Sequence, residues 1–199
     1  QAGRARLRAL DSYRLLDTPR EQDIDEIAEA AAELCETPIA VVNLVGDGRQ
    51  FFKAEVGLGV RETPLESSFC ARALLEDEML VVPDLTRDAR FDCNPLVTDA
   101  PHIRAYAGAL LKTADGLPIG TLCVLDYRSR AFTPLQQESL RVLARQVMAQ
   151  LDLRRAVHDR DRRLEQLEAS ENRLRLVLDS ARDYAIVTTD PRRRITSWS

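Results

Sequence analysis

The chain has 199 residues, of which 45% are hydrophobic and 30% charged, a composition typical of a globular fold with one domain and part of another. The formal net charge of −4 gives no support to nucleic-acid binding. No apolar run approaches the 18 residues of a membrane span, and the first residues lack the apolar stretch of a signal peptide. We therefore expect a cytoplasmic protein without a membrane span.

The four cysteines lie far apart in the sequence and form no CxxC motif. They are Cys35, Cys70, Cys93 and Cys123. Neither a disulfide framework nor a metal site has the required spacing, so we expect reduced thiols and no bound metal.

The N-terminal third predicts two helices and then a hairpin. Residues 5–16 have the apolar pattern of a short helix. In the next helix, Thr18 is expected to act as the cap, Pro19 as the first residue and Glu21 as the capping-box glutamate. Its apolar positions recur at helical spacing: Ile24, Ile27, Ala28, Ala31, Leu34 and Cys35. Residues 38–46 and 50–57 then predict two paired strands.

The middle of the chain predicts a short helix, a strand and a long loop. "SSFCARALLE" (67–76) predicts a helix of about two and a half turns, with serines as caps and Phe69 and Cys70 on the first turn. Residues 79–85 form a strand that Pro83 confines to an edge or an end. Residues 86–104 contain prolines and many turn formers, as in long loops that carry function.

The C-terminal half predicts a second hairpin, a long helix and then a further pair of strands. Residues 105–113 and 117–127 are nearly continuous apolar strands, which indicates a sheet covered on both faces. Thr133 and Pro134 open a helix that continues to about residue 175, and residues 184–190 and 194–199 predict two more strands. The whole pattern predicts an α+β fold with an antiparallel sheet.

A heptad seam follows the long helix. One position holds Leu143, Val157 and Leu164, and the other holds Leu153, Leu167 and Leu174, with polar interruptions at Gln150, Arg160 and Glu171. The seam favours a parallel coiled coil that makes a dimer over a solvated single helix.

Several segments resemble a bacterial sensory subfamily of GAF domains: "SSFCARALL", "LVVPDLTRDARFDCNPLV", "PHIRAYAGALL" and "PIGTLCVLD". This resemblance covers residues 6–152, and "ENRLRLVLDSARDYAIVTTDPRRRITSWS" resembles the start of a PAS domain. It implies a GAF domain with an N-terminal helix (1–151), a coiled-coil signalling linker (152–175) and a truncated PAS domain (176–199). It also implies a GAF-type sheet of about six strands.

The arrangement of GAF, linker and PAS is typical of sensor histidine kinases, and less often of diguanylate cyclases. The resemblance therefore implies a two-component sensory module that homodimerises through its N-terminal and linker helices and acts on a downstream PAS and output domain. We expect no enzymatic activity from the chain itself. A ligand-free dimerisation module is the alternative.

The same resemblance implies a pocket between the sheet, the 67–76 helix and the 86–104 loop. Its candidate residues are Phe52, Phe69, Cys70, Asp84, Leu96, His102, Tyr106 and Cys123. They would suit an unknown small molecule. The residues also allow other interpretations: Cys123 as plain core, and Asp84 and Asp92 as turn caps.

Particular cofactors fit poorly. No Cys-His dipeptide of the bilin-carrying type is present, the cyclic-nucleotide signature is absent, and haem would have only His102 as an axial ligand. A second alternative is thiol chemistry. Cys70 near a helix N-terminus and Cys93 in the loop could form a redox-sensing pair, or act as in the GAF enzymes that reduce free methionine sulfoxide.

Overall fold

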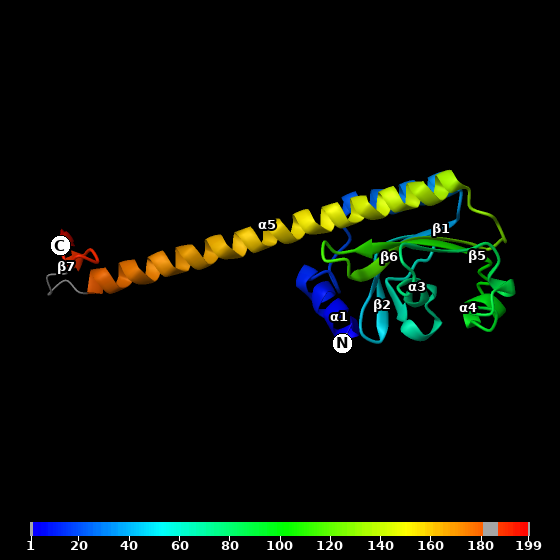
Figure 1. Ribbon diagram of the computed structural model, residues 1–199, viewed down its shortest axis with the longest axis horizontal. Coiled ribbons are helices and arrows are strands. Elements are labelled where there is room, and N and C mark those ends of the chain that lie inside the picture. The colour runs from blue at the N-terminus through cyan, green and yellow to red at the C-terminus, as the bar shows by residue number, and fades with distance from the viewer. Residues whose placement is uncertain (1, 181–186, 199) are drawn as a thin grey trace. The chain divides into compact units, whose positions relative to one another are not determined.

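The computed structural model describes residues 2–180 and 187–198, in two compact units with the boundary after Leu153. The first unit contains the six-stranded sheet and the helices that cover it (Figure 1). The second contains the rest of the long helix and a two-stranded sheet. Within the described residues, no helix combines the length and the apolar character needed to cross a membrane.

Two helices precede the sheet: α1 (Ala2–Tyr13) and α2 (Gln22–Cys35). The predicted capping box of α2 is wrong, because the helix begins three residues later than expected. Its N-cap is Glu21, which makes no side-chain capping bond. Glu21 pairs instead with Lys53, whose ammonium also donates to the Thr18 hydroxyl. Both presumed capping side chains are thus used to bind a buried cation.

The apolar stripe of α2 differs from the predicted stripe at one position. Leu34 is 53% exposed, whereas Ala32 is buried with the rest of the stripe. Cys35 is fully buried, as expected for a core residue. Glu36 follows the helix in a left-handed conformation, with φ of 52°.

The sheet is antiparallel throughout, in the order β3-β2-β1-β6-β5-β4. The strands are β1 (Ile39–Val45), β2 (Arg49–Val56), β3 (Glu62–Pro64), β4 (Met79–Val82), β5 (Ala105–Lys112) and β6 (Pro118–Asp126). Both predicted hairpins are confirmed, and β4 lies at an edge, as Pro83 indicated. The short edge strand β3 was not predicted, because three residues cannot show a period.

Two hydrophobic layers cover the two faces of the sheet. On one face, α2 and the first part of α5 (Pro134–Ser180) pack against alternate strand residues such as Ala40, Val42 and Leu44. On the other face, α3 (Phe69–Ala73), the 86–104 loop and α4 (Pro95–Thr98) cover the intervening residues (Figure 1). Since both faces are buried, the central strands are apolar at nearly every position.

The covering elements of the second face are short. The helix α3 has five residues, fewer than predicted, but Ser68 caps it by accepting a hydrogen bond from the backbone of Ala71 at 3.1 Å. The long loop contains α4 and the 3₁₀ turn η2 (Leu85–Arg87). Asp84 caps η2 by accepting from the backbone of Thr86, as predicted for a turn residue.

The long helix α5 begins with the predicted cap and proline. The Thr133 hydroxyl accepts from the backbone of Gln136, and the Gln136 side chain accepts from the backbone of Thr133. Up to Leu151 one side of α5 is buried in the core, and between Leu153 and Val177 its large apolar residues are exposed.

The second unit ends in two strands. They are β7 (Val187–Thr189) and β8 (Ile195–Trp198), which pair in antiparallel fashion around a turn. The first part of the predicted strand at 184–190 lies outside the described residues.

Candidate functional site

Six of the eight predicted pocket residues come together on the α3 face of the sheet. They are Phe52, Phe69, Cys70, Leu96, Tyr106 and Cys123. The other two lie outside this cluster: Asp84 caps η2, and His102 is exposed with φ of 60°. The six form a packed hydrophobic layer, so side chains occupy much of the volume that the pocket prediction assigned to a ligand.

Two cysteines meet at the centre of this layer. Cys123 lies in the middle of β6, where its register partners are Val41 on β1 and Gly108 on β5. Cys70 comes from the first turn of α3, which Ser68 caps. The two sulfur atoms are 3.6 Å apart, and both residues are buried.

A tyrosine hydroxyl completes this centre. Tyr106 on β5 is fully buried, and its hydroxyl donates to the Cys70 sulfur at 3.5 Å. The hydroxyl fits because Gly108, two residues along the strand, has no side chain. A Cβ at position 108 would lie 2.2 Å from the Tyr106 oxygen.

A buried polar network adjoins the cysteines. The side chain of Gln50 accepts from Asn43 at 3.0 Å and from Ser68 at 2.6 Å, and donates to Thr63 at 2.5 Å. Ser68 therefore joins the cap of α3 to the second strand.

Two polar atoms beside this network have no hydrogen-bond partner among the described residues: Asn43 Oδ1 and Thr121 Oγ1. The two residues are fully buried and directly opposed across β1 and β6. Sequence reasoning missed both. The available signal was a single polar residue inside each apolar strand, "AVVNLV" and "IGTLCVL". Unpartnered buried polar atoms are costly, and the Thr121 side chain lies near the Cys70 and Cys123 sulfurs, whose pKa values it lowers.

The surroundings shift the pKa values of the two thiols in opposite directions. A hydrogen bond with Cys123 lowers the pKa of Cys70 to about 6, although burial opposes this shift. The same hydrogen bond and burial raise the pKa of Cys123 well above its usual value. The pair thus gives up its first proton readily and keeps the second. Burial and the nearby Cys70 charge raise the pKa of Tyr106, which stays a donor.

Cys123, and not Cys93, is the cysteine whose sulfur lies beside that of Cys70. Cys93 is exposed in the 86–104 loop, where Asp92 raises its pKa. It lines a cleft of about 350 Å³ together with Ser68, Arg72, Phe91 and neighbouring loop residues. The Cys70–Cys93 pair stays a prediction, and the partner that the structure gives Cys70 is Cys123.

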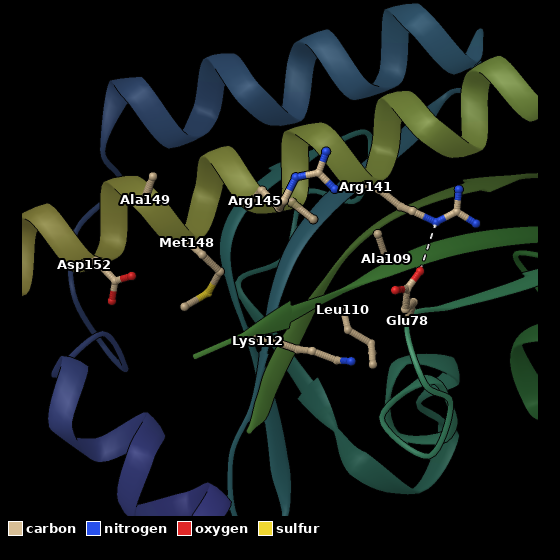
Figure 2. A pocket seen from close by; sticks show the side chains of 10 residues that line it. Glu78, Ala109, Leu110, Lys112, Arg141, Arg145, Met148, Ala149 and Asp152 are labelled. Atoms are coloured by element: carbon tan, nitrogen blue, oxygen red, sulfur yellow. Dashed lines mark ion pairs between the residues drawn. The ribbon is translucent and has the colours of Figure 1, made fainter. Parts of the chain in front are cut away.

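A second concavity lies on the opposite face, between α5 and β5 (Figure 2). It has a volume of about 390 Å³, with small apolar residues such as Ala109 and Ala144 and a rim of charged side chains. Arg141 forms an ion pair with Glu78 across it, with Nε and Oε2 3.7 Å apart. None of the predicted site residues lines it. The part of the chain that the structure describes contains no group of three or more His, Cys, Asp or Glu suited to a metal ion.

An antiparallel six-stranded sheet with long helices on one face and a short helix and a long loop on the other defines an α+β domain whose sheet is covered on both faces. The chain belongs to the GAF domain family, whose model matches residues 19–151. This confirms the family and the fold that the sequence resemblance implied.

One relative and two solved structures are similar to this chain. The chain is 39% identical over 173 residues to a cyclic di-GMP phosphodiesterase of Pseudomonas aeruginosa, a match that covers 85% of this chain and 28% of that protein. The chain thus spans little more than a quarter of that relative.

The GAF domain of an Acinetobacter phosphoenolpyruvate-protein phosphotransferase has a TM-score of 0.57 at 16% identity, covering 78% of this chain and 95% of its own. A domain of a putative two-component sensor histidine kinase from Sinorhizobium meliloti 1021 has a TM-score of 0.56 at 20% identity, covering 72% and 99%. These two structures support the fold.

Proposed function

We propose that this chain is the regulatory module of a bacterial signalling protein, in which the GAF domain passes a conformational change through α5 to a downstream catalytic domain. The observation that carries this proposal is the length of the match to the P. aeruginosa phosphodiesterase. The match is 173 residues long, which is longer than the GAF domain at residues 19–151, so it extends beyond that domain. A shared segment outside the domain is expected where the connection itself carries the signal.

Cyclic di-GMP turnover is the output that we propose. The relative that shares sequence with this chain is named for hydrolysis of that nucleotide, which favours it over the histidine kinase that the sequence resemblance implied. The chain itself is proposed to be regulatory and cytoplasmic, with catalysis in another part of a longer protein.

The input reaches the α3 face of the sheet. Phe52, Tyr106 and Cys123 are buried there against α3, so a small molecule would enter only if α3 and the loop moved. Such a movement is the conformational change that the proposal needs, because these elements are short and rest on the strands that α5 contacts from the opposite face. A packed interior also suits the alternative of a ligand-free dimerisation module.

A homodimer is the proposed working state. Beyond the GAF domain, α5 has a row of apolar side chains at heptad spacing with no partner in the described part of a single chain: Leu153, Val157, Leu164, Leu167 and Leu174. A second copy of the helix would cover this row as a coiled coil. The pair β7 and β8 is proposed to open a PAS domain, the next module along the chain.

A domain exchange tests the proposal. The matching segment of the P. aeruginosa phosphodiesterase is replaced by the residues of this chain, and the rate of cyclic di-GMP hydrolysis is compared with that of a version that lacks residues 19–151. We expect the two rates to differ several-fold, since the GAF domain sets the activity of the catalytic part. Equal rates in two folded, active proteins would contradict a regulatory role.

A further inference from the structure

We propose that Cys70 and Cys123 are a redox-active dithiol that a hydroperoxide oxidises to an intramolecular disulfide. The contact that carries this inference is the 3.6 Å separation of the two sulfur atoms, on α3 and β6. The chemistry lies beyond the proposed regulatory role and does not depend on it, since it involves only residues inside the GAF domain.

The geometry allows the bond after a small movement. A disulfide is about 2.05 Å long, so the sulfurs must approach by roughly 1.6 Å. Cys123 is held in the centre of the sheet between β1 and β5, whereas Cys70 lies on a five-residue helix. The approach therefore moves α3 towards the sheet, and the Ser68–Gln50 bond beside it moves as well.

The surroundings favour reaction at Cys70. The Tyr106 hydroxyl donates to its sulfur, which stabilises a thiolate, the reactive form of a cysteine. The lowered pKa of Cys70 agrees with this geometry. The side chains of Thr121 and Asn43 lie beside the same sulfur and also lower the pKa of Cys70. The cleft of about 350 Å³ is lined by Ser68 and Arg72, two residues before and after Cys70, so this is the side from which a hydroperoxide would approach.

The proposed reaction has two balanced steps. The Cys70 thiolate attacks the terminal oxygen of the hydroperoxide, the O–O bond breaks, and the leaving oxygen takes a proton to give an alcohol or water, so that Cys70 becomes a sulfenic acid. The Cys123 sulfur then attacks the Cys70 sulfur, the S–O bond breaks, and the hydroxyl leaves with the Cys123 proton as water. The dithiol loses two electrons and the peroxide gains them.

The other two cysteines serve as internal controls. Cys35 is buried on the opposite face of the sheet, and burial raises its pKa to about 11 although the charge of Arg130 opposes this, so it is a poor nucleophile near pH 7. Cys93 is exposed and has a raised pKa. A reagent that simply oxidised accessible thiols would select Cys93 first.

The test is peptide mapping of the whole reduced chain after treatment with one equivalent of hydrogen peroxide, with free thiols then blocked by N-ethylmaleimide under denaturing conditions. Trypsin places the four cysteines in separate peptides, with Cys70 in 62–72, Cys123 in 113–128 and Cys93 in 91–104. We expect a disulfide that joins 62–72 to 113–128 and two blocked thiols, those of Cys35 and Cys93.

Two variants sharpen the result. Cys93→Ser should leave the disulfide unchanged, and Cys123→Ser should replace it with a Cys70 sulfenic acid that dimedone traps. The proposal would be overturned if Cys93 were oxidised while Cys70 and Cys123 stayed reduced and were found blocked by N-ethylmaleimide. A disulfide that joins 62–72 to 91–104 would also overturn it. The wild-type map needs no variant to fold, and its outcome is separate from that of the domain exchange.

Discussion

The Tyr13 hydroxyl donates a hydrogen bond to Asp152 Oδ1 at 2.6 Å and so joins α1 to α5 at the last turn of the GAF unit. Tyr13 is buried. Asp152 is the second-last residue of the first unit, which ends at Leu153. Because α5 leaves the core at this point, the bond holds the helix where the proposed signal leaves the domain.

The change Tyr13→Phe removes this bond and keeps the ring in place. We expect it to lower the free energy of unfolding of the first unit by about 1 kcal/mol, as measured by urea denaturation. Tyr127→Phe is the matched control, because Tyr127 is 45% exposed, and it should change stability by less than about 0.5 kcal/mol. Equal effects in the two variants would show that the Tyr13 bond has no special weight.

Lys53 is a fully buried cation that ties the segment between α1 and α2 to the sheet. Its ammonium lies 2.5 Å from Glu21 Oε1, 2.8 Å from Thr18 Oγ1 and 2.7 Å from the Pro19 carbonyl oxygen. We expect Lys53→Met to lower stability by about 2–3 kcal/mol, because the segment loses three charge-assisted bonds.

A double-mutant cycle isolates the ion pair within this cluster. Glu21→Gln alone removes the charge of the partner, and the double variant Lys53→Met/Glu21→Gln should be less destabilised than the sum of the two single changes. Strict additivity in urea denaturation would mean that Lys53 and Glu21 do not act together.

The N-terminal half shows where sequence reasoning succeeds and where it does not. The positions of the strands and helices could be predicted from the spacing of hydrophobic residues and from the positions of Gly and Pro, because these are local signals. The capping box at Thr18 and Glu21 was wrong because a residue far along the chain, Lys53, binds both side chains. A local motif cannot show that a buried charge on β2 competes for the same groups.

Gly108 provides the space that the buried tyrosine needs. We expect Gly108→Ala to lower stability by about 1–3 kcal/mol, since the new methyl group would meet the Tyr106 hydroxyl at 2.2 Å and displace the ring or the strand. Thermal or urea unfolding measures this effect. Gly3→Ala is the control, because a Cβ there meets no atom within 4 Å and the position is helical. A Gly108→Ala protein as stable as Gly3→Ala would contradict the packing described for Tyr106.

The exposed heptad row of α5 predicts a dimer. Leu167 is 61% exposed in the single chain, and we expect Leu167→Asp to give monomers in light scattering, because a coiled-coil core does not accept a buried carboxylate. Ala169→Asp adds the same charge two residues away, at a position facing outward from the seam, and should remain dimeric. A dimer that survives Leu167→Asp would remove the coiled coil as its cause.

The candidate site was only partly predictable. Cys70, Tyr106 and Cys123 were expected in one pocket, because the family resemblance implies it, and the structure brings them together in one layer. The pairing of Cys70 with Cys123 was not foreseen, since the alignment of α3 over β6 depends on packing between segments 53 residues apart. His102 was expected in the pocket, but the local turn exposes it.

If α5 carries the signal as a helix of defined phase, insertions in α5 of the hybrid phosphodiesterase must act according to the rotation that they impose. Two alanines inserted after Glu165 rotate the downstream part by roughly 200°, whereas a seven-residue insertion that repeats residues 159–165 restores the heptad phase. We expect cyclic di-GMP hydrolysis to change several-fold with two added residues and to return to within about twofold of the starting rate with seven. Rates that are the same for both insertions, or that fall steadily with linker length, would contradict this expectation.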